Sequence, residues 1–374
     1  MQPFRLVVPQ AELDDLRERL ARTRLPAHPA GEGWSAGVDA AELARLVAYW
    51  REGFDWRGAE ARLAETPQFT VELDGQLVHF AWLRAERAPG APEPRAIVLG
   101  HGWPYSYVEM LRLAHRLARP AEAGDEAFDV VVPSLPGFGF SAPFAEGPFV
   151  STRVAELWHA LMTGLGYAHY FSYGEDVGAS ASDQLAARHP EAVVGLFATH
   201  AAFPPEERSG ELGEAELAFR RFLDEKWAGE HGYAQIQSTK PDTLAVGLTD
   251  SPAGLLAWLL EKFRTWSDGE AQFRAAWSDD DILTTVSVYW FSGCIGTSFR
   301  AYSDDRHETP LPEIDVPVGV AVQHGERGFP REYAARSYRD IRVWHDLPSG
   351  GHFTAHQSPE LVAAEFRAFA ALIG

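Results

Sequence analysis

The chain has 374 residues, of which 46% are hydrophobic and 23% charged, a composition typical of a globular protein with one large core and an inserted or appended piece. The formal net charge of −20 opposes binding to phosphate backbones, so we expect no nucleic-acid partner. Cys294 is the single cysteine, which excludes an intrachain disulfide, and the lack of a signal-like N-terminus or a long apolar run predicts a cytoplasmic protein without a membrane span.

The first 65 residues are predicted to form a helical region. Leucines recur at helical spacing over 13–20, and Leu43, Leu46 and Trp50 repeat the pattern over 40–50. A β-hairpin is predicted next, because Asp74-Gly75 separates two β-rich runs within 69–80.

Strands and helices then alternate from residue 95 onwards. The expected strands are 96–99, 128–133, 168–173 and 193–199, and the expected helices are 107–117, 151–165 and 178–188. The alternation stops at His200, and residues 201–300 are helical in pattern and rich in aromatic side chains. It resumes with a strand at 316–322, a helix at 330–339, a strand at 341–344 and a last helix at 358–371.

Such alternation predicts an α/β protein with a mostly parallel central sheet covered by helices on both faces. The helical stretch that interrupts the alternation is predicted to form a lid over the carboxyl edge of the sheet. We therefore expect four segments, namely an N-terminal helical region (1–65), the first part of the α/β core (66–200), a helical lid (201–300) and the second part of the core (301–374).

The strongest chemical signal is the sequence Gly174-Glu-Asp-Val-Gly178, between a predicted strand and a predicted helix. A small residue on each side of a central reactive residue is typical of a nucleophile elbow, a sharp turn that holds one side chain up. Asp176 occupies that position, and a carboxylate suits attack on a saturated carbon to give an alkyl ester. The plainer interpretation is a tight turn whose aspartate caps the next helix.

Two further loops follow strands and supply partners for Asp176. The His101-Gly-Trp-Pro104 loop can present backbone N–H groups, so Trp103 and Val177, the residue after the nucleophile, are the expected oxyanion donors. His352, in the glycine loop after the last predicted strand, is the expected general base. The alternatives are a proline-terminated loop and one incidental histidine among 14.

A carboxylate is also needed to orient His352. Glu326 lies just past the strand at 316–322, and Glu332 lies six residues further on, in a predicted helix. Either one could be an ordinary surface glutamate.

Taken together, these motifs resemble the epoxide hydrolases of the microsomal type, along nearly the whole length of the chain. The resemblance rests on the N-terminal helices, the His-Gly-Trp-Pro loop and the elbow, and most specifically on the strings at 232–243, 250–255 and 298–302. It implies an α/β-hydrolase fold, Asp176 as nucleophile and His352 as base. It also implies that Tyr233 and Tyr302 hydrogen-bond the epoxide oxygen and that the Trp103-Pro104 bond is cis.

The chain departs from the family pattern at two places. Many relatives have Gly-Gly-Asp-Trp-Gly at the elbow, whereas this chain has Glu175 and Val177, which changes the pocket wall and its charge. Relatives often have Phe-Pro before the orienting acid, where this chain has Gln323-His324. By position the acid falls on Glu326, with Glu332 as the alternative because a Phe-Pro pair precedes it at 329–330.

The leading hypothesis is hydrolysis of a small-molecule epoxide to a diol, with no cofactor and no metal. A haloalkane dehalogenase-like hydrolase is the alternative enzyme, although valine replaces the tryptophan that commonly follows the nucleophile there. A catalytically silent binding protein on the same fold is the alternative outside catalysis. Assembly into a homo-oligomer is left open.

Overall fold

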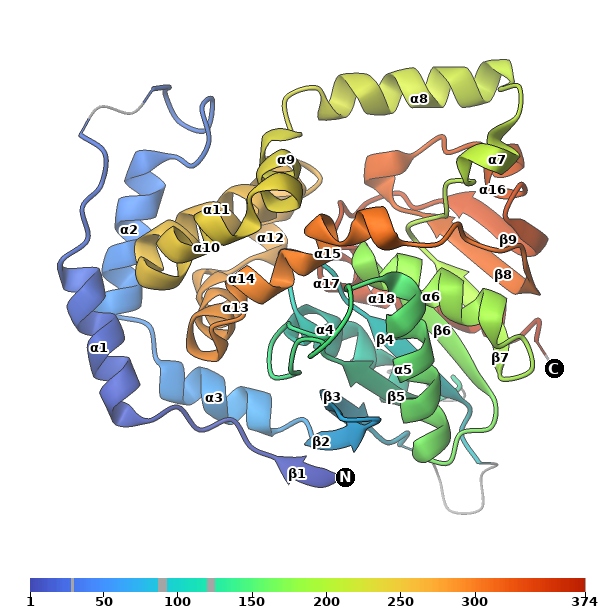
Figure 1. Cartoon of the computed structure of the whole chain (residues 1–374), viewed down its shortest axis with the longest axis horizontal. Helices are drawn as coiled ribbons and strands as arrows, with labels where there is room; N and C mark the ends of the chain where they lie inside the picture. The colour runs from blue at the N-terminus through green and yellow to red at the C-terminus, as the bar shows by residue number, and fades with distance from the viewer. Residues whose placement is uncertain (28–29, 87–92, 120–124, 374) are drawn as a thin grey trace.

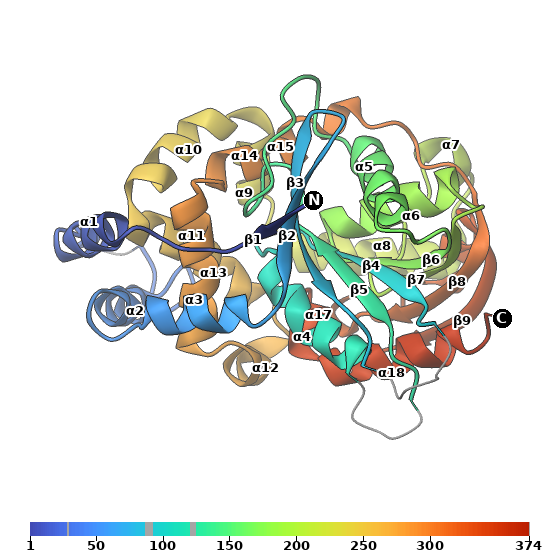
Figure 2. The same cartoon turned by 90° about the horizontal axis from the view of Figure 1, so that it is seen from below.

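The structure, a computed structural model, describes residues 1–27, 30–86, 93–119 and 125–373. Within these residues, one nine-stranded sheet has the order β1-β2-β3-β5-β4-β6-β7-β8-β9 (Figures 1 and 2). The pairs β1–β2, β2–β3 and β3–β5 are antiparallel, and all other neighbours are parallel. The strands are β1 (Gln2–Phe4), β2 (Gln68–Leu73), β3 (Gln76–Leu83), β4 (Ala96–Gly100), β5 (Asp129–Pro133), β6 (Tyr170–Gly174), β7 (Val193–Ala198), β8 (Ile314–Val322) and β9 (Tyr338–Asp346).

Local sequence explains both kinds of strand. Every residue of β4, β5 and β6 is buried, as expected for short apolar strands covered by helices on both faces. The predicted hairpin is confirmed as β2 and β3, and its turn residues Asp74 and Gly75 have φ of 48° and 78°. Positive φ at both central residues is what a tight hairpin turn requires and what Asp-Gly supplies.

Helices cover both faces of the parallel part of the sheet. Figure 2 shows α5 (Ser151–Gly164) and α6 (Val177–Arg188) on one face, and α4 (Tyr107–Ala118) and α18 (Pro359–Ala370) on the other. This arrangement confirms the predicted α/β-hydrolase fold with its mostly parallel sheet. The loops after β4, β6, β7 and β8 therefore emerge at one edge, and the short helix α17 (Thr354–Gln357) lies in the segment after β9.

Between β7 and β8 the chain is helical. Its elements are α7 (Glu206–Ser209), α8 (Glu214–Trp227), α9 (Gly232–Thr239), α10 (Pro241–Asp250), α11 (Pro252–Thr265), α12 (Gly269–Ala276), α13 (Asp279–Ser292), α14 (Ile295–Ser298), α15 (Arg300–Ser303) and the 3-10 turn η1 (Asp305–His307). No single helix in the described residues is long and apolar enough to cross a membrane. Two pairs of helices within 241–303 meet that requirement only when both helices of the pair are counted together, and each pair is sharply bent.

The N-terminal helices pack against this helical insertion rather than against the sheet (Figure 1). They are α1 (Gln10–Ala21), α2 (Ala40–Glu52) and α3 (Trp56–Ala64). Trp50 on α2 is buried and donates its indole N–H to Ser287 Oγ on α13 at 3.0 Å, and Arg45 forms an ion pair with Asp279 at 2.6 Å. The first helices therefore brace the insertion that overlies the sheet.

One predicted element is wrong. The helix expected over 330–339 is reduced to α16 (Arg331–Ala334), because Tyr338 and Asp340 already pair with β8 as the start of β9. The η2 turn (His324–Glu326) precedes it. The four segment boundaries given above stay predictions.

Candidate active site

Asp176 lies at the sharp turn between β6 and α6. Its φ of 54° and ψ of −123° are strained for a residue with a side chain. The flanking glycines allow the turn, because a Cβ on Gly174 would lie 2.1 Å from the Gly178 carbonyl oxygen and a Cβ on Gly178 would lie 2.5 Å from the Gly100 carbonyl carbon. Asp176 makes no side-chain capping bond to α6, so the elbow interpretation fits better than the helix-cap interpretation.

Backbone N–H groups hold the carboxylate of Asp176. The N–H of Trp103 donates to Asp176 Oδ1 at 2.9 Å, and the backbone N–H of Val177 also favours the anion. Gly102 leaves room for this approach, because a Cβ there would lie 2.3 Å from Asp176 Oδ1. The Trp103-Pro104 bond is cis, as the family resemblance implied.

His352 faces the other oxygen of the carboxylate. Its Nε2 lies 3.5 Å from Asp176 Oδ2, and both side chains are mostly buried. Burial alone raises the pKa of Asp176, but His352 and the N–H groups of Trp103 and Val177 stabilise the anion and leave that pKa below its usual value. The site therefore holds an ionised carboxylate beside an imidazole.

The two glutamates considered as the orienting acid have different surroundings. Glu326 ends the η2 turn, is half-buried and interacts electrostatically with His352. Burial raises the pKa of Glu326, whereas His352 and Lys226 lower it. Glu332 is exposed on α16. Of the two glutamates, Glu326 is therefore the one whose charge acts on His352.

Tyr233 on α9 and Tyr302 on α15 meet above the oxyanion loop. Tyr233 stacks on the Trp103 ring with centroids 5.3 Å apart, and Tyr302 packs edge-on against the same ring at 5.8 Å. The two hydroxyl groups hydrogen-bond to each other. Burial, with the charge of Asp176, raises the pKa of both phenols, so both stay protonated and able to donate.

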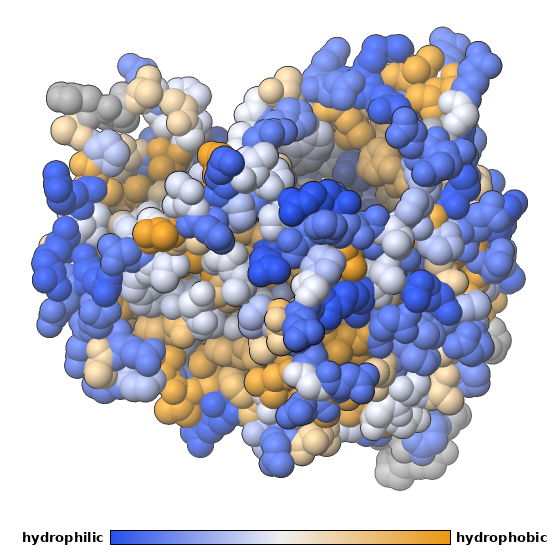
Figure 3. Space-filling model, in the orientation of Figure 1, coloured by the Kyte–Doolittle hydropathy of each residue, from blue (hydrophilic) through white to orange (hydrophobic). Residues whose placement is uncertain are grey.

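A cavity of about 340 Å³ connects this centre to the outside, and Asp176, His200 and Glu326 line it. Phe203 borders both this cavity and the recess below α8, where Figure 3 shows the surface hollowed. A separate cavity of about 250 Å³ reaches His352 and lies beside Trp266. Nucleophile and base are thus each bordered by open space.

Glu175 was noted in the sequence only as a departure from the family pattern, and the structure shows how closely it is bound into the site. Its side chain is fully buried, and Oε1 accepts hydrogen bonds from Tyr173 OH at 2.6 Å and from the Ala355 N–H at 2.7 Å. Tyr105 OH donates to Oε2 at 3.4 Å. Burial raises the pKa of Glu175 to about 7, because its effect outweighs these hydrogen bonds and the nearby His352, which lower the pKa.

His200, directly after β7, is a contact that the sequence did not reveal. Its Nδ1 accepts a hydrogen bond from the Asp176 N–H at 3.4 Å, and its Nε2–H donates to the His352 carbonyl oxygen at 3.0 Å. Burial and the neighbouring His352 lower the pKa of His200 to about 3, so the ring is neutral and can accept and donate at once. It links the backbones of nucleophile and base.

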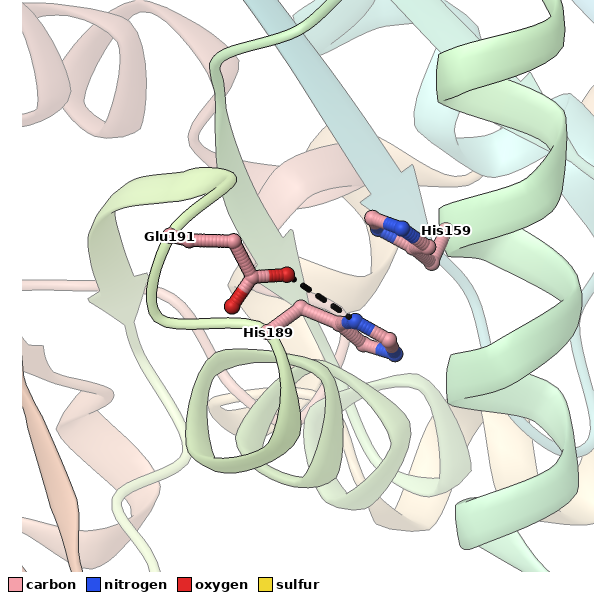
Figure 4. Close-up of side chains that lie close together, drawn as sticks. All are labelled: His159, His189 and Glu191. Carbon is pink, nitrogen blue, oxygen red and sulfur yellow. Dashed lines mark ion pairs between the residues drawn. The ribbon is translucent and has the colours of Figure 1, made fainter.

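A second cluster of ionisable side chains, on α5 and the turn after α6, contains His159, His189 and Glu191 (Figure 4). The imidazoles of His159 and His189 stack 3.8 Å apart with planes only 5° from parallel. Imidazole lone pairs lie in the ring plane, so these two nitrogens cannot point at one ion in this arrangement. Contacts with Tyr170 and Glu156 instead hold the two rings in place.

Comparisons with known proteins agree with this geometry. Residues 1–110 match the family model for the epoxide hydrolase N terminus, and residues 95–285 match the model for the alpha/beta hydrolase fold. A protein of Stigmatella aurantiaca with a provisional epoxide hydrolase name is 37% identical over 98% of this chain and 83% of its own length. Epoxide hydrolase 1 of Sus scrofa is 30% identical over 100% of this chain and 89% of its own length.

A solved structure gives the same picture. The juvenile hormone epoxide hydrolase of the silkworm Bombyx mori superimposes with a TM-score of 0.90 at 29% identity, over 100% of this chain and 95% of that one. The match extends from the N-terminal helices through the helical insertion to the last helix. The chain therefore belongs to the epoxide hydrolases of the microsomal type, which join an N-terminal helical region to an α/β-hydrolase fold.

Proposed function

We propose that this chain hydrolyses epoxides to vicinal diols through a covalent alkyl ester on Asp176. The observation that carries the proposal is the position of the Asp176 carboxylate, with one oxygen bound by the Trp103 N–H at 2.9 Å and the other 3.5 Å from His352 Nε2. That arrangement suits a nucleophile whose ester is later attacked by water.

In the first step, an oxygen of Asp176 attacks an epoxide carbon and the carbon–oxygen bond of the ring breaks. The departing oxygen receives a hydrogen bond, and then a proton, from the Tyr233–Tyr302 pair. Phenols with raised pKa values are neutral donors, which suits stabilisation of a developing alkoxide. Asp176 is left as a neutral alkyl ester.

In the second step, His352 takes a proton from water and the resulting hydroxide attacks the ester carbonyl of Asp176. The N–H groups of Trp103 and Val177 bind the oxyanion that forms. Glu326 stabilises the imidazolium through its charge. When the intermediate collapses, the leaving oxygen takes the proton of the new carboxyl group, which releases the diol and restores the Asp176 carboxylate. The proton held by His352 returns to the tyrosinate left by the first step, so one water is consumed per epoxide.

Residues 201–300 act in this proposal as a lid that carries Tyr233 and covers the nucleophile. Support comes from the ring stacking of Tyr233 on Trp103 and from the N–H of His352, which donates to the Trp266 carbonyl oxygen at 2.9 Å. The lid thus contacts the oxyanion loop through stacked rings and the histidine loop through a hydrogen bond. An enclosed site would keep bulk water from the ester until His352 activates one molecule.

The test is turnover of a simple aryl epoxide such as styrene oxide, with diol formation followed by chromatography. Halide release from a chloroalkane of similar size is assayed in parallel. We expect diol without halide, because Val177 offers no side-chain N–H to bind a leaving halide. Halide release without diol would support the dehalogenase alternative, and neither product would support a silent binding protein.

A further inference from the structure

The carboxyl group of Glu175 is buried beside the nucleophile, a position that is unfavourable for an acid unless it is well hydrogen-bonded. All three groups that donate to it are neutral, namely two phenols and one backbone N–H. A glutamate that only filled space here would lose more by desolvation than an apolar side chain of similar size. Its presence in the centre of the site calls for a further role.

The hydrogen bonds of Glu175 join three parts of the active site. Tyr173 lies on β6, Tyr105 lies in the loop after β4 that also holds Trp103, and Ala355 lies on α17, three residues after His352. The Glu175 side chain therefore ties the nucleophile strand to the oxyanion loop and to the histidine loop. Movement of any one of them relative to the others would break at least one of these bonds.

Glu175 also interacts electrostatically with His352. The other titratable groups that face it are Tyr173 and Tyr105, whose pKa values burial raises, so they remain neutral. Above its pKa of about 7, Glu175 carries a negative charge, which favours the protonated imidazole that forms when His352 takes a proton from water. The side chain thus has both a geometric and an electrostatic connection to the second half of the reaction.

We propose that Glu175 is a positioning residue for ester hydrolysis, which holds the His352 loop in register with Asp176 and stabilises the imidazolium by its charge. The inference rests on the proposed function, since it assigns Glu175 to the second of the two steps described there. It predicts that loss of the charge slows hydrolysis of the ester and leaves its formation nearly unchanged.

The experiment is rapid mixing of the full chain with styrene oxide, followed by acid quench at set times. Mass analysis of the Asp176 peptide measures ester formation and decay, and chromatography measures diol. For Glu175→Gln, which keeps the shape and an acceptor oxygen, we expect ester formation within about threefold of wild type and hydrolysis at least about tenfold slower. The ester should accumulate.

Glu109→Gln is the matched control. Glu109 is likewise a buried glutamate, and burial raises its pKa to about 7, but its bonds go to Ser106, which caps α4, and to Thr285 on α13. We expect both chemical steps of this variant to stay within about threefold of wild type. A general penalty for replacing a buried glutamate would slow the two variants alike and would overturn the proposal.

The pH profile of ester hydrolysis separates the electrostatic role from a merely structural one. Because the charge of Glu175 favours protonated His352, its removal should move the midpoint of the rising limb to lower pH, with a lower plateau. Tyr173→Phe removes only the hydroxyl that donates to Glu175, so it should also slow hydrolysis, by a smaller factor. This variant replaces Glu175→Gln in the test if Glu175→Gln does not fold.

The outcomes distinguish this inference from the proposed function. Absence of any ester on Asp176 in the wild-type protein contradicts the proposed function itself. If the wild-type protein forms the ester but Glu175→Gln leaves the hydrolysis rate and the midpoint of its pH profile unchanged, only the role of Glu175 is contradicted. If Glu175→Gln does not fold, the same result in Tyr173→Phe has the same meaning. Loss of ester formation in folded Glu175→Gln contradicts that role as well, because the residue would then act in the first step.

Discussion

Glu326 and Glu332 carry the same functional group, but Glu326 borders the cavity at Asp176 whereas Glu332 is exposed on α16. We expect Glu326→Gln to slow ester hydrolysis and let the Asp176 ester build up, because His352 loses a charge that stabilises its protonated form. Glu332→Gln should leave both steps close to wild type. Trapping of the ester by mass analysis provides the measurement, and a larger effect at Glu332 would contradict the assignment.

Tyr233 and Tyr302 share one hydrogen bond and one neighbouring ring, so they are expected to act as a pair. Each change to phenylalanine should slow ring opening, since a lost hydrogen bond to a developing oxyanion costs about 2.7–4 kcal/mol. The double variant should be nearly inactive. Single-turnover rates of ester formation test this, and full activity of the double variant would remove the tyrosines from the mechanism.

At the scale of single elements, the elbow depends on the absence of side chains at its glycines. In Gly178→Ala the new Cβ would lie 2.5 Å from the Gly100 carbonyl carbon, a contact with rigid backbone that must push β4 and α6 apart. Overpacking of this kind typically costs about 1–3 kcal/mol or more, and it displaces Asp176. We expect a lower free energy of unfolding together with loss of activity.

Gly164→Ala is the control for that prediction, because Gly164 ends α5 and a Cβ added there would meet nothing within 4 Å beyond the backbone of its own helix. An alanine in a helix is favoured over glycine by roughly 0.5–1 kcal/mol. Denaturant unfolding of the two variants should therefore give shifts of opposite sign. Equal shifts would show that the elbow tolerates a side chain.

Most elements could be predicted from the sequence because their signals are local. Buried strands such as β4 and β5 are short apolar runs between turns, and α4 has regular helical spacing. The predicted helix at 330–339 failed because pairing of Tyr338 and Asp340 with β8 outweighs local preference, a tertiary effect. The nine-residue α3 buries only three residues, so its pattern is short.

The same division between local and tertiary signals explains which candidate site residues could be predicted from the sequence. Asp176, Trp103 and His352 lie in glycine- or proline-bearing loops after strands, where family motifs are strongest. Glu175 and His200 are joined to the site by hydrogen bonds with residues 180 and 152 positions away, Ala355 and His352 respectively. No local pattern encodes such contacts, so only the folded arrangement identifies them.

At the scale of the whole molecule, a buried acid couples stability to pH. Asp183 on α6 accepts a hydrogen bond from Tyr338 OH at 2.9 Å, and burial raises its pKa to about 8. The folded protein therefore keeps a proton that the unfolded chain releases near the ordinary value of 3.8. By linkage, Asp183 lowers the free energy of unfolding as pH rises from about 4 to about 8.

Asp183→Asn removes this titration while keeping an acceptor for Tyr338. The free energy of unfolding of the variant minus that of wild type should increase from about pH 5 to about pH 9, because only wild type loses stability through this titration. Guanidinium unfolding at the two pH values provides the measurement. A difference that stays constant with pH would show that Asp183 does not hold a proton in the folded state.

If the reaction passes through an ester on Asp176, the oxygen that the first turnover delivers to the diol comes from the protein and not from water. With enzyme in excess over styrene oxide in heavy-oxygen water, water attacks the ester carbonyl, so the first-turnover diol should be unlabelled and the Asp176 peptide should carry the label. Over many turnovers the label should appear in the diol. A labelled first-turnover diol with unlabelled Asp176 would mean that water attacks the epoxide directly, which contradicts the nucleophile assignment.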